Sequence, residues 1–165
     1  MGTERLARRE FMGLSAATVA GLALTGRTAV AAGQRFSVTR TPAEWKRILG
    51  PGRYHILREA GTEPPYSNPL LDEHRKGTFN CAGCRQPLFL SSTKFESGTG
   101  WPSFWKVLPA RAITRSDRSL GMERTEVLCA RCGGHLGHVF DDGPRPTGLR
   151  YCMNGLALTF QEAER

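Results

Sequence analysis

The sequence of 165 residues lacks several features that mark common classes of protein. No uncharged segment reaches the roughly 20 apolar residues of a membrane-spanning helix, because the run over residues 11–26 is short and diluted by Gly and Thr. With hydrophobic residues at only 39%, this excludes a multi-span membrane protein. There is no repeat, no low-complexity tract and no basic run beyond Arg75-Lys76. We therefore expect no nucleic-acid partner despite the net charge of +8, since nucleic-acid-binding proteins usually carry a basic stripe or cluster.

Glycine and proline, in contrast, are abundant. The chain has 19 Gly and 10 Pro, about 18% of its residues against about 12% in ordinary globular chains. This composition excludes a helical bundle or coiled coil and favours short strands joined by turns.

The N-terminal residues have the features of an export signal. Positively charged residues precede the uncharged run, and Ala29-Val30-Ala31 supplies the small residues of a signal-peptidase site. The segment Arg8-Arg9-Glu10-Phe11-Met12 resembles a twin-arginine signal. We predict a twin-arginine-type signal peptide over residues 1–31 and an exported, periplasmic domain over residues 32–165 without a membrane span. A general secretory signal or an uncleaved anchor is the alternative.

The remaining sequence predicts a mainly β domain. Thr41-Pro42-Ala43-Glu44 is typical of a capped helix start, and Gly50-Pro51 ends that helix. A second short helix is expected over residues 54–60. Short extended segments follow around residue 79 and over 88–90, 105–108, 112–115, 126–129, 139–140, 150–153 and 156–160. We expect a compact, mostly antiparallel β fold with short N-terminal helices.

Four of the five cysteines form two Cys-x-x-Cys pairs. They are Cys81, Cys84, Cys129 and Cys132. The two-residue spacing lets both sulfurs of a pair face one ion, and two pairs complete a tetrahedral shell. Disulfides, a redox dithiol or iron are the alternatives. We predict one zinc ion that links the hairpins over residues 78–85 and 127–134, and a closed shell of this kind stabilises a fold without taking part in chemistry.

The fifth cysteine, Cys152, is the candidate nucleophile. In a strand, residues two apart lie on one face, so Arg150, Cys152 and Asn154 are expected to point together. A guanidinium beside the sulfur lowers the pKa of the thiol and favours the reactive thiolate. A buried structural cysteine is the alternative.

Two further segments contain candidate site residues. His135 and His138 lie near Asp142, an arrangement that suits proton transfer near neutral pH, although metal ligands or surface residues would have the same spacing. Residues 98–101 predict an exposed, bent loop that carries Trp101. That indole either packs in the core or contacts a small apolar group of a ligand.

Taken together, these motifs resemble the type B methionine sulfoxide reductases, which act on the R epimer. The similar segments are residues 59–63, 66–70, 79–84, 100–104, 135–138 and 150–154, in a motif core that spans residues 54–160. The resemblance implies two antiparallel sheets in a zinc-stabilised, barrel-like fold. It also implies that residues 32–165 form a reductase domain, which we expect to be a monomer.

The resemblance assigns the central chemistry to Cys152 and the two histidines. Cys152 attacks the sulfoxide sulfur and becomes a sulfenic acid. His138, with His135 beside it, protonates the sulfoxide oxygen as the S–O bond weakens. The implied substrates are oxidised proteins or methionine sulfoxide itself.

The resemblance also assigns supporting roles. Asp142 and Arg150 orient and polarise the site, and Asn154 is a supporting polar group. Trp101 packs on the terminal methyl group of the substrate, and Phe104 is placed with it among the substrate-binding residues.

One position departs from the pattern of the family. Many members carry a resolving cysteine where this chain has Thr99, and no sixth cysteine is present. We therefore expect an external thiol, either a thioredoxin-like protein or a small molecule, to reduce the sulfenic acid. The alternative function is a non-catalytic zinc-ribbon binding module, which would not need Cys152, His138 and Trp101 in one place.

Overall fold

The computed structural model describes residues 35–164, so the predicted signal peptide over residues 1–31 lies outside the described residues. The helix is α1 (Pro42–Glu59), and the strands are β1 (Gly77–Cys81), β2 (Pro87–Leu90), β3 (Lys94–Phe95), β4 (Ser103–Phe104), β5 (Ala112–Asp117), β6 (Arg124–Cys129), β7 (His135–Phe140), β8 (Arg150–Met153) and β9 (Leu158–Glu162). Four short 3-10 turns lie at Pro69–Asp72, Ser91–Thr93, Ser119–Gly121 and Gly155–Ala157. Within this range no helix has the length and apolar character needed to cross a bilayer.

The N-terminal helical region has the start and the break that the sequence predicts. Thr41 and Glu44 form a reciprocal capping box, in which the Thr41 hydroxyl accepts from the Glu44 N–H. Gly50 has a non-helical backbone (φ 67°, ψ 174°), and Pro51 follows it, so α1 consists of two helical segments joined by a kink. Trp45 and Ile56, one from each segment, are buried in the core.

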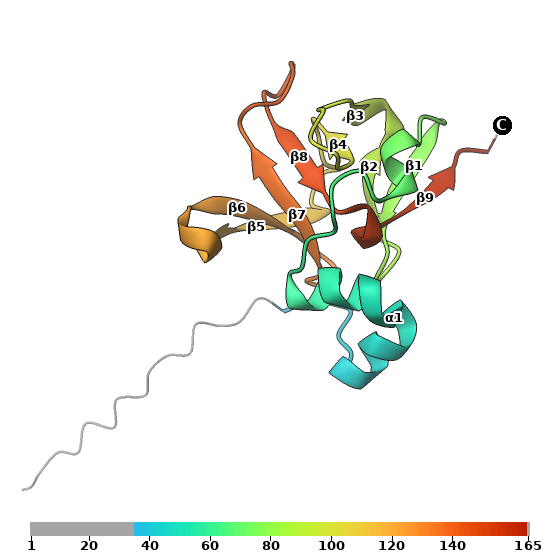
Figure 1. The fold of residues 1–165 in the computed structure, drawn as a ribbon. Helices are drawn as coiled ribbons and strands as arrows, with labels where there is room; N and C mark the ends of the chain where they lie inside the picture. The colour runs from blue at the N-terminus through green and yellow to red at the C-terminus, as the bar shows by residue number, and fades with distance from the viewer. Residues whose placement is uncertain (1–34, 165) are drawn as a thin grey trace, which may run out of the picture. The chain divides into compact units, whose positions relative to one another are not determined.

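The strands form two antiparallel sheets, as expected. The smaller sheet has the order β2-β1-β9, and the larger has the order β3-β4-β8-β7-β6-β5. The two sheets of the described region remain separate and do not close into one barrel. Figure 1 shows the β5–β6 hairpin extending from one side of the larger sheet, while β1, β2 and β9 lie on the other side of the domain.

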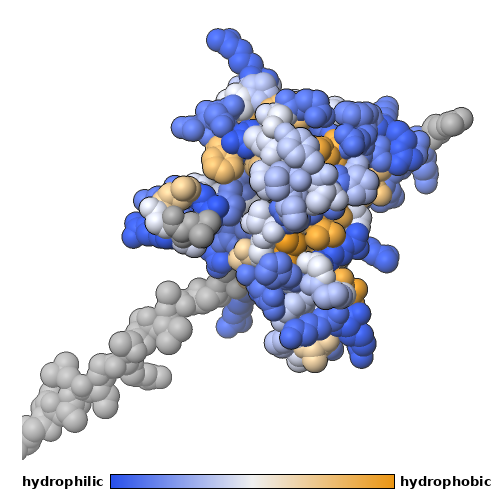
Figure 2. Space-filling model, in the orientation of Figure 1, coloured by the Kyte–Doolittle hydropathy of each residue, from blue (hydrophilic) through white to orange (hydrophobic). Residues whose placement is uncertain are grey.

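Aromatic side chains from both sheets fill the core. The ring of Phe104 on β4 stacks on Phe89 of β2 at 4.3 Å between centroids, and Phe79 of β1 meets its edge at 4.9 Å. All three side chains are fully buried. These contacts join the smaller sheet to β4, which neighbours β8 in the larger one. On the face drawn in Figure 2, hydrophilic residues cover most of the surface of the domain.

Three predicted strands differ from the structure. The strand expected over residues 139–140 is the end of β7, which begins at His135. Residues 105–108 are not a strand, since the ladder of β4 ends at Phe104 and only separate backbone bonds follow, such as Leu108 N–H to Leu88 O at 2.8 Å. The last strand begins at Leu158, because residues Gly155–Ala157 form a 3-10 turn. Strand β3 is only two residues long and has no periodicity that the sequence could reveal.

Candidate active site

Three neighbouring strands bring the candidate residues together. Cys152 on β8 lies opposite His138 on β7 and opposite Ser103 on β4. Side chains directly opposite each other in an antiparallel sheet lie on the same face. At Gly137, a Cβ atom would lie 2.1 Å from the Cys152 carbonyl oxygen, so only glycine permits this approach of β7 to β8.

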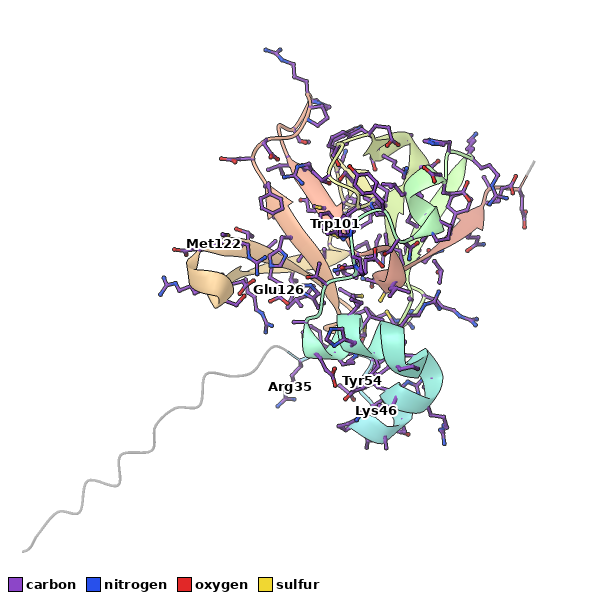
Figure 3. The ribbon with its side chains drawn as sticks, in the orientation of Figure 1. Arg35, Lys46, Tyr54, Trp101, Met122 and Glu126 are labelled. Carbon is purple, nitrogen blue, oxygen red and sulfur yellow. The ribbon has the colours of Figure 1, made fainter. Side chains whose placement is uncertain are left out.

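These residues open onto a cavity of about 130 Å³. Its lining is formed by Thr62, Trp101, Arg124, Gly137, His138, Phe140, Cys152 and Asn154. Figure 3 shows Trp101 beside β8 and the segment that follows α1. A thiol, an imidazole and an indole from three separate parts of the sequence therefore share one small cavity.

The charge state of Cys152 differs from the expectation drawn from the sequence. Burial raises the pKa of the Cys152 thiol, and this effect outweighs a hydrogen bond with Thr99 and the positive charge of Arg150, both of which lower it. The net shift therefore favours the thiol form of the resting residue over the expected thiolate. The guanidinium acts in the expected direction, but desolvation is the larger effect.

Arg150 and Asp142 form a bidentate ion pair. The Nε and Nη2 atoms of Arg150 donate to the two carboxylate oxygens of Asp142, each at 2.8 Å, and the guanidinium stacks over the Phe140 ring at 4.4 Å. The pair holds the pKa of Asp142 below its usual value. The Asp142 side chain is mostly exposed and is not among the cavity-lining residues, so it orients Arg150 from outside the cavity.

His138 has a partner that the sequence did not indicate. Its Nε2 atom lies 2.7 Å from a carboxylate oxygen of Asp117 on β5, and that oxygen also accepts from Arg124 at 2.8 Å. Hydrogen bonds from Ser119, together with His138, hold the pKa of Asp117 well below its usual range. Asp117 is 21 residues away in sequence and belongs to no motif.

His135 lies behind the cavity and does not line it. Its Nδ1 atom is 2.6 Å from Glu126 on β6, and both side chains are buried. Glu126 is also bound by Arg115 on β5. Burial lowers the pKa of His135, although Glu126 opposes this effect. The ring meets that of His138 edge-on at 5.5 Å, so His135 supports the position of His138.

Glu63 is a second residue missed by sequence reasoning, and it connects three parts of the site. The backbone carbonyl of Glu63 accepts from Trp101 Nε1 at 3.1 Å, and its N–H donates to Asn154 Oδ1 at 3.1 Å. Its carboxylate is buried and accepts from the backbone of Gly155 and Leu156. Glu63 lies in one of the segments that resemble the family, so its position could have been singled out from the sequence. Its hydrogen bonds to distant residues could not be predicted in this way.

Phe104 does not have the position expected of a substrate-binding residue. Its side chain is fully buried between Phe79 and Phe89 and does not line the cavity. Trp101, three residues earlier, is half-buried and does line it. Both aromatic residues lie in one segment of the sequence. Side chains alternate between the two faces of β4, and Phe104 therefore points into the core.

The sulfur atoms of the four paired cysteines lie close together. Their Sγ atoms all lie within 4.8 Å of one another, with Cys81 to Cys132 at 3.7 Å and Cys84 to Cys129 at 3.5 Å. Four sulfurs around zinc at its usual bond length are about 3.8 Å apart, so the separations fit a tetrahedral ion. No disulfide joins the four cysteines, and none of them lines the cavity of Cys152.

The two cysteine turns have matching backbone hydrogen bonds. In the first, the Arg85 N–H donates to Cys81 O at 2.8 Å; in the second, the Gly133 N–H donates to Cys129 O at 2.8 Å. Each turn joins the strands of a hairpin, β1–β2 in one case and β6–β7 in the other. A metal ion here would link the smaller sheet to the larger one, as the cysteine spacing predicts.

Comparison with known proteins adds an independent result. Residues 49–162 match the family model described as the SelR domain. A protein of Methanosarcina barkeri named peptide methionine sulfoxide reductase MsrB is 53% identical over 129 residues, which cover 78% of this chain and 91% of that protein. Proteins of the same name from Agrobacterium fabrum and Thiobacillus denitrificans are 53% and 55% identical, over 93% and 92% of their lengths and 75% and 73% of this chain. The matched range includes both the cavity and the four-cysteine cluster.

Proposed function

This chain belongs to the SelR-domain family and is a peptide methionine sulfoxide reductase, and from this premise we propose that it acts on the R epimer through nucleophilic attack by Cys152. The observation that carries the proposal is the position of the Cys152 thiol in one cavity with His138 and Trp101. The overall step converts a sulfoxide and the Cys152 thiol into a thioether and a Cys152 sulfenic acid.

The shape of the site supports selection of one epimer. The sulfoxide sulfur carries an oxygen, a methyl group, the side-chain carbon and a lone pair. If the methyl group packs on Trp101, the oxygen points to His138 and the side-chain carbon points to the opening of the cavity, three substituent directions are fixed and only one epimer presents its sulfur to Cys152. The assignment of that epimer as R rests on the family resemblance.

The cavity contains groups that can give and take the protons of the reaction. Because Cys152 rests as a thiol, attack requires its proton to leave, and the sulfoxide oxygen must gain one. We assign the proton donor to His138, whose Nε2 is held by Asp117, leaving Nδ1 to exchange a proton with the substrate. Arg150, fixed by Asp142, stabilises negative charge on the sulfur.

Regeneration of the thiol is proposed to use an external reductant. The chain has five cysteines, and four belong to the cluster, so Cys152 has no resolving partner that leaves the metal site intact. Two external thiols would convert the sulfenic acid into a thiol, one disulfide and water. Proteins with oxidised methionine, or the free amino acid, are the proposed substrates.

We further propose that the cluster of Cys81, Cys84, Cys129 and Cys132 holds zinc. The ion would supply only cross-linking of the two hairpins, because four sulfurs leave no open position for substrate. From residues 1–31 alone, we propose export to the periplasm by the twin-arginine route.

The test is an epimer-resolved reductase assay on the full chain with dithiothreitol as reductant. We expect methionine from the R-sulfoxide only, and no turnover above background for Cys152→Ser. Trp101→Ala should mainly raise KM, since it removes the contact with the methyl group. Turnover by Cys152→Ser would refute the nucleophile, and equal use of both epimers would refute the proposed arrangement.

A further inference from the structure

Thr99 is held in a defined position beside Cys152. Its Oγ1 atom lies 3.8 Å from the Cys152 sulfur. Tyr66 holds the loop from both sides: its hydroxyl donates to Gly98 O at 2.7 Å, and its N–H donates to Gly100 O at 2.8 Å. Gly100 has φ of +88°, and a Cβ there would lie 2.7 Å from Pro65, so the loop packs tightly against this segment.

Two serine hydroxyls extend this row of polar contacts beyond Thr99. The Ser97 hydroxyl lies 2.8 Å from the Thr99 hydroxyl and 2.8 Å from the Ser103 hydroxyl. Ser103 is buried, and its hydroxyl donates to the Trp101 carbonyl at 3.1 Å. The hydroxyls form a row from Cys152 through Thr99, Ser97 and Ser103 to the backbone of Trp101, and Ser103, which lies opposite Cys152, is also close enough to lower the pKa of the thiol directly.

One assignment of the hydroxyl protons satisfies every contact in this row. A hydroxyl has one proton, and in the resting assignment that of Ser103 is donated to the Trp101 carbonyl, which can only accept. Ser97 must then donate to Ser103, and Thr99 must donate to Ser97. The Thr99 oxygen is left as an acceptor for the S–H of Cys152, which agrees with a resting thiol.

We propose that Thr99, Ser97 and Ser103 form a reversible hydroxyl chain, which accepts a hydrogen bond from the Cys152 thiol and donates one to the sulfur after the thiol has lost its proton. Reversal requires only rotation of the three O–H bonds, and no proton passes along the chain. The thiol proton leaves into the cavity. In the reversed state Thr99 donates to the sulfur, Ser97 donates to Thr99, and Ser103 donates to Ser97.

The reversal also affects Trp101, the residue proposed to contact the methyl group of the substrate. When Ser103 turns to Ser97, the Trp101 carbonyl loses the hydroxyl donor that it has in the resting state. Ionisation of Cys152 is thereby coupled to the backbone of the residue that faces the substrate methyl group. This inference deepens the proposed function, on which its catalytic meaning rests, and it gives Thr99 a role at the position where many family members have a cysteine.

Other charged or titratable groups also face the sulfur, and the experiment must separate their effects from that of Thr99. Arg150 lies on the same strand, His138 lies opposite on β7, and Arg124 lines the cavity. On the side of β4 and the 97–100 loop, the facing groups are the neutral hydroxyls of Thr99 and Ser103. A change confined to Thr99 therefore leaves Arg150, His138 and Arg124 in place.

The experiment measures the alkylation rate of Cys152 by iodoacetamide against pH, read by mass spectrometry of the Cys152 peptide from the zinc-loaded full chain. Thr99→Val removes the hydroxyl and keeps the shape. We expect its pH profile to move upward by about one unit, so that alkylation at pH 7.5 is about tenfold slower while the limiting rate at high pH is unchanged. Thr99→Ser keeps the hydroxyl and should stay within about twofold of the wild type.

Ser97→Ala provides a second test that does not alter the residue in contact with the sulfur. It removes the donor to Thr99 in the reversed state, and we expect a smaller shift in the same direction. A Thr99→Val profile that overlays the wild type would overturn the proposal, and if that variant does not fold, an unchanged Ser97→Ala profile would do so. Alkylation requires no sulfoxide, so a failed reductase assay with the expected shift would count against the proposed function alone.

Discussion

The buried carboxylate of Glu63 offers a direct test of how this site is held together. Only 4% of the residue is exposed, and its two oxygens accept from Gly155 N–H, Leu156 N–H and Asn68 Nδ2. Replacement by glutamine keeps the shape and one acceptor oxygen. The new NH2 group must face at least one of these donors, so two donors oppose each other in a buried position.

The expected loss of stability follows from these contacts. A buried donor left without an acceptor costs about 1–3 kcal/mol, and Glu63→Gln leaves one backbone N–H and the new amide in that state. We therefore expect a loss of about 2–6 kcal/mol, a large share of the roughly 5–15 kcal/mol of an ordinary domain. For a domain of this size the melting temperature should fall by about 8–24 °C.

Thermal unfolding followed by circular dichroism measures this fall. The matched control is Glu59→Gln, since Glu59 is 51% exposed and its only ion pair within the described residues is with His55, which is itself 58% exposed. The control should change stability by less than about 0.5 kcal/mol. If Glu63→Gln melted within about 2 °C of the wild type, the reasoning from its three hydrogen bonds would be wrong.

Three further predictions concern the metal cluster, a buried histidine and the missing resolving cysteine. Cys84→Ser should lose bound zinc and cooperative unfolding, whereas Cys152→Ser should retain both; metal analysis and thermal melts on the two proteins decide this. Because burial lowers the pKa of His135 in the folded state, unfolding takes up a proton below pH 6.5, so stability should fall from pH 7.5 to 5. Melting temperatures against pH measure this fall, and it should be smaller in His135→Asn; equal slopes would contradict it. Thr99→Cys places a sulfur near an atom now 3.8 Å from the Cys152 sulfur, so one turnover should form a disulfide, detectable by non-reducing peptide mapping. A free thiol at position 99 of that variant after turnover would refute the geometry.

The secondary structure and the four-cysteine cluster were largely predictable, because their signals are local. The capping box at Thr41 lies within four residues, and the break at Gly50-Pro51 is a property of those two residues. The spacing of the two cysteine pairs alone predicts two turns that are able to bind a metal ion together. Strand β8 was predicted with its correct bounds, whereas the position of the last strand depended on a 3-10 turn that has no periodicity.

The sequence by itself determined which residue types carry the chemistry: one cysteine outside the pairs, two histidines and an indole, arranged in motifs that resemble one family. Only the tertiary structure decided which of them share a cavity and which partners they have. Asp117 reaches His138 from β5, and Glu63 reaches Gly155 across 92 positions, and neither distance leaves a local pattern. The charge of Cys152 depended on the fold as well. Neighbouring residues predict the effect of Arg150, but burial depends on the packing of the whole domain, and burial is the larger effect.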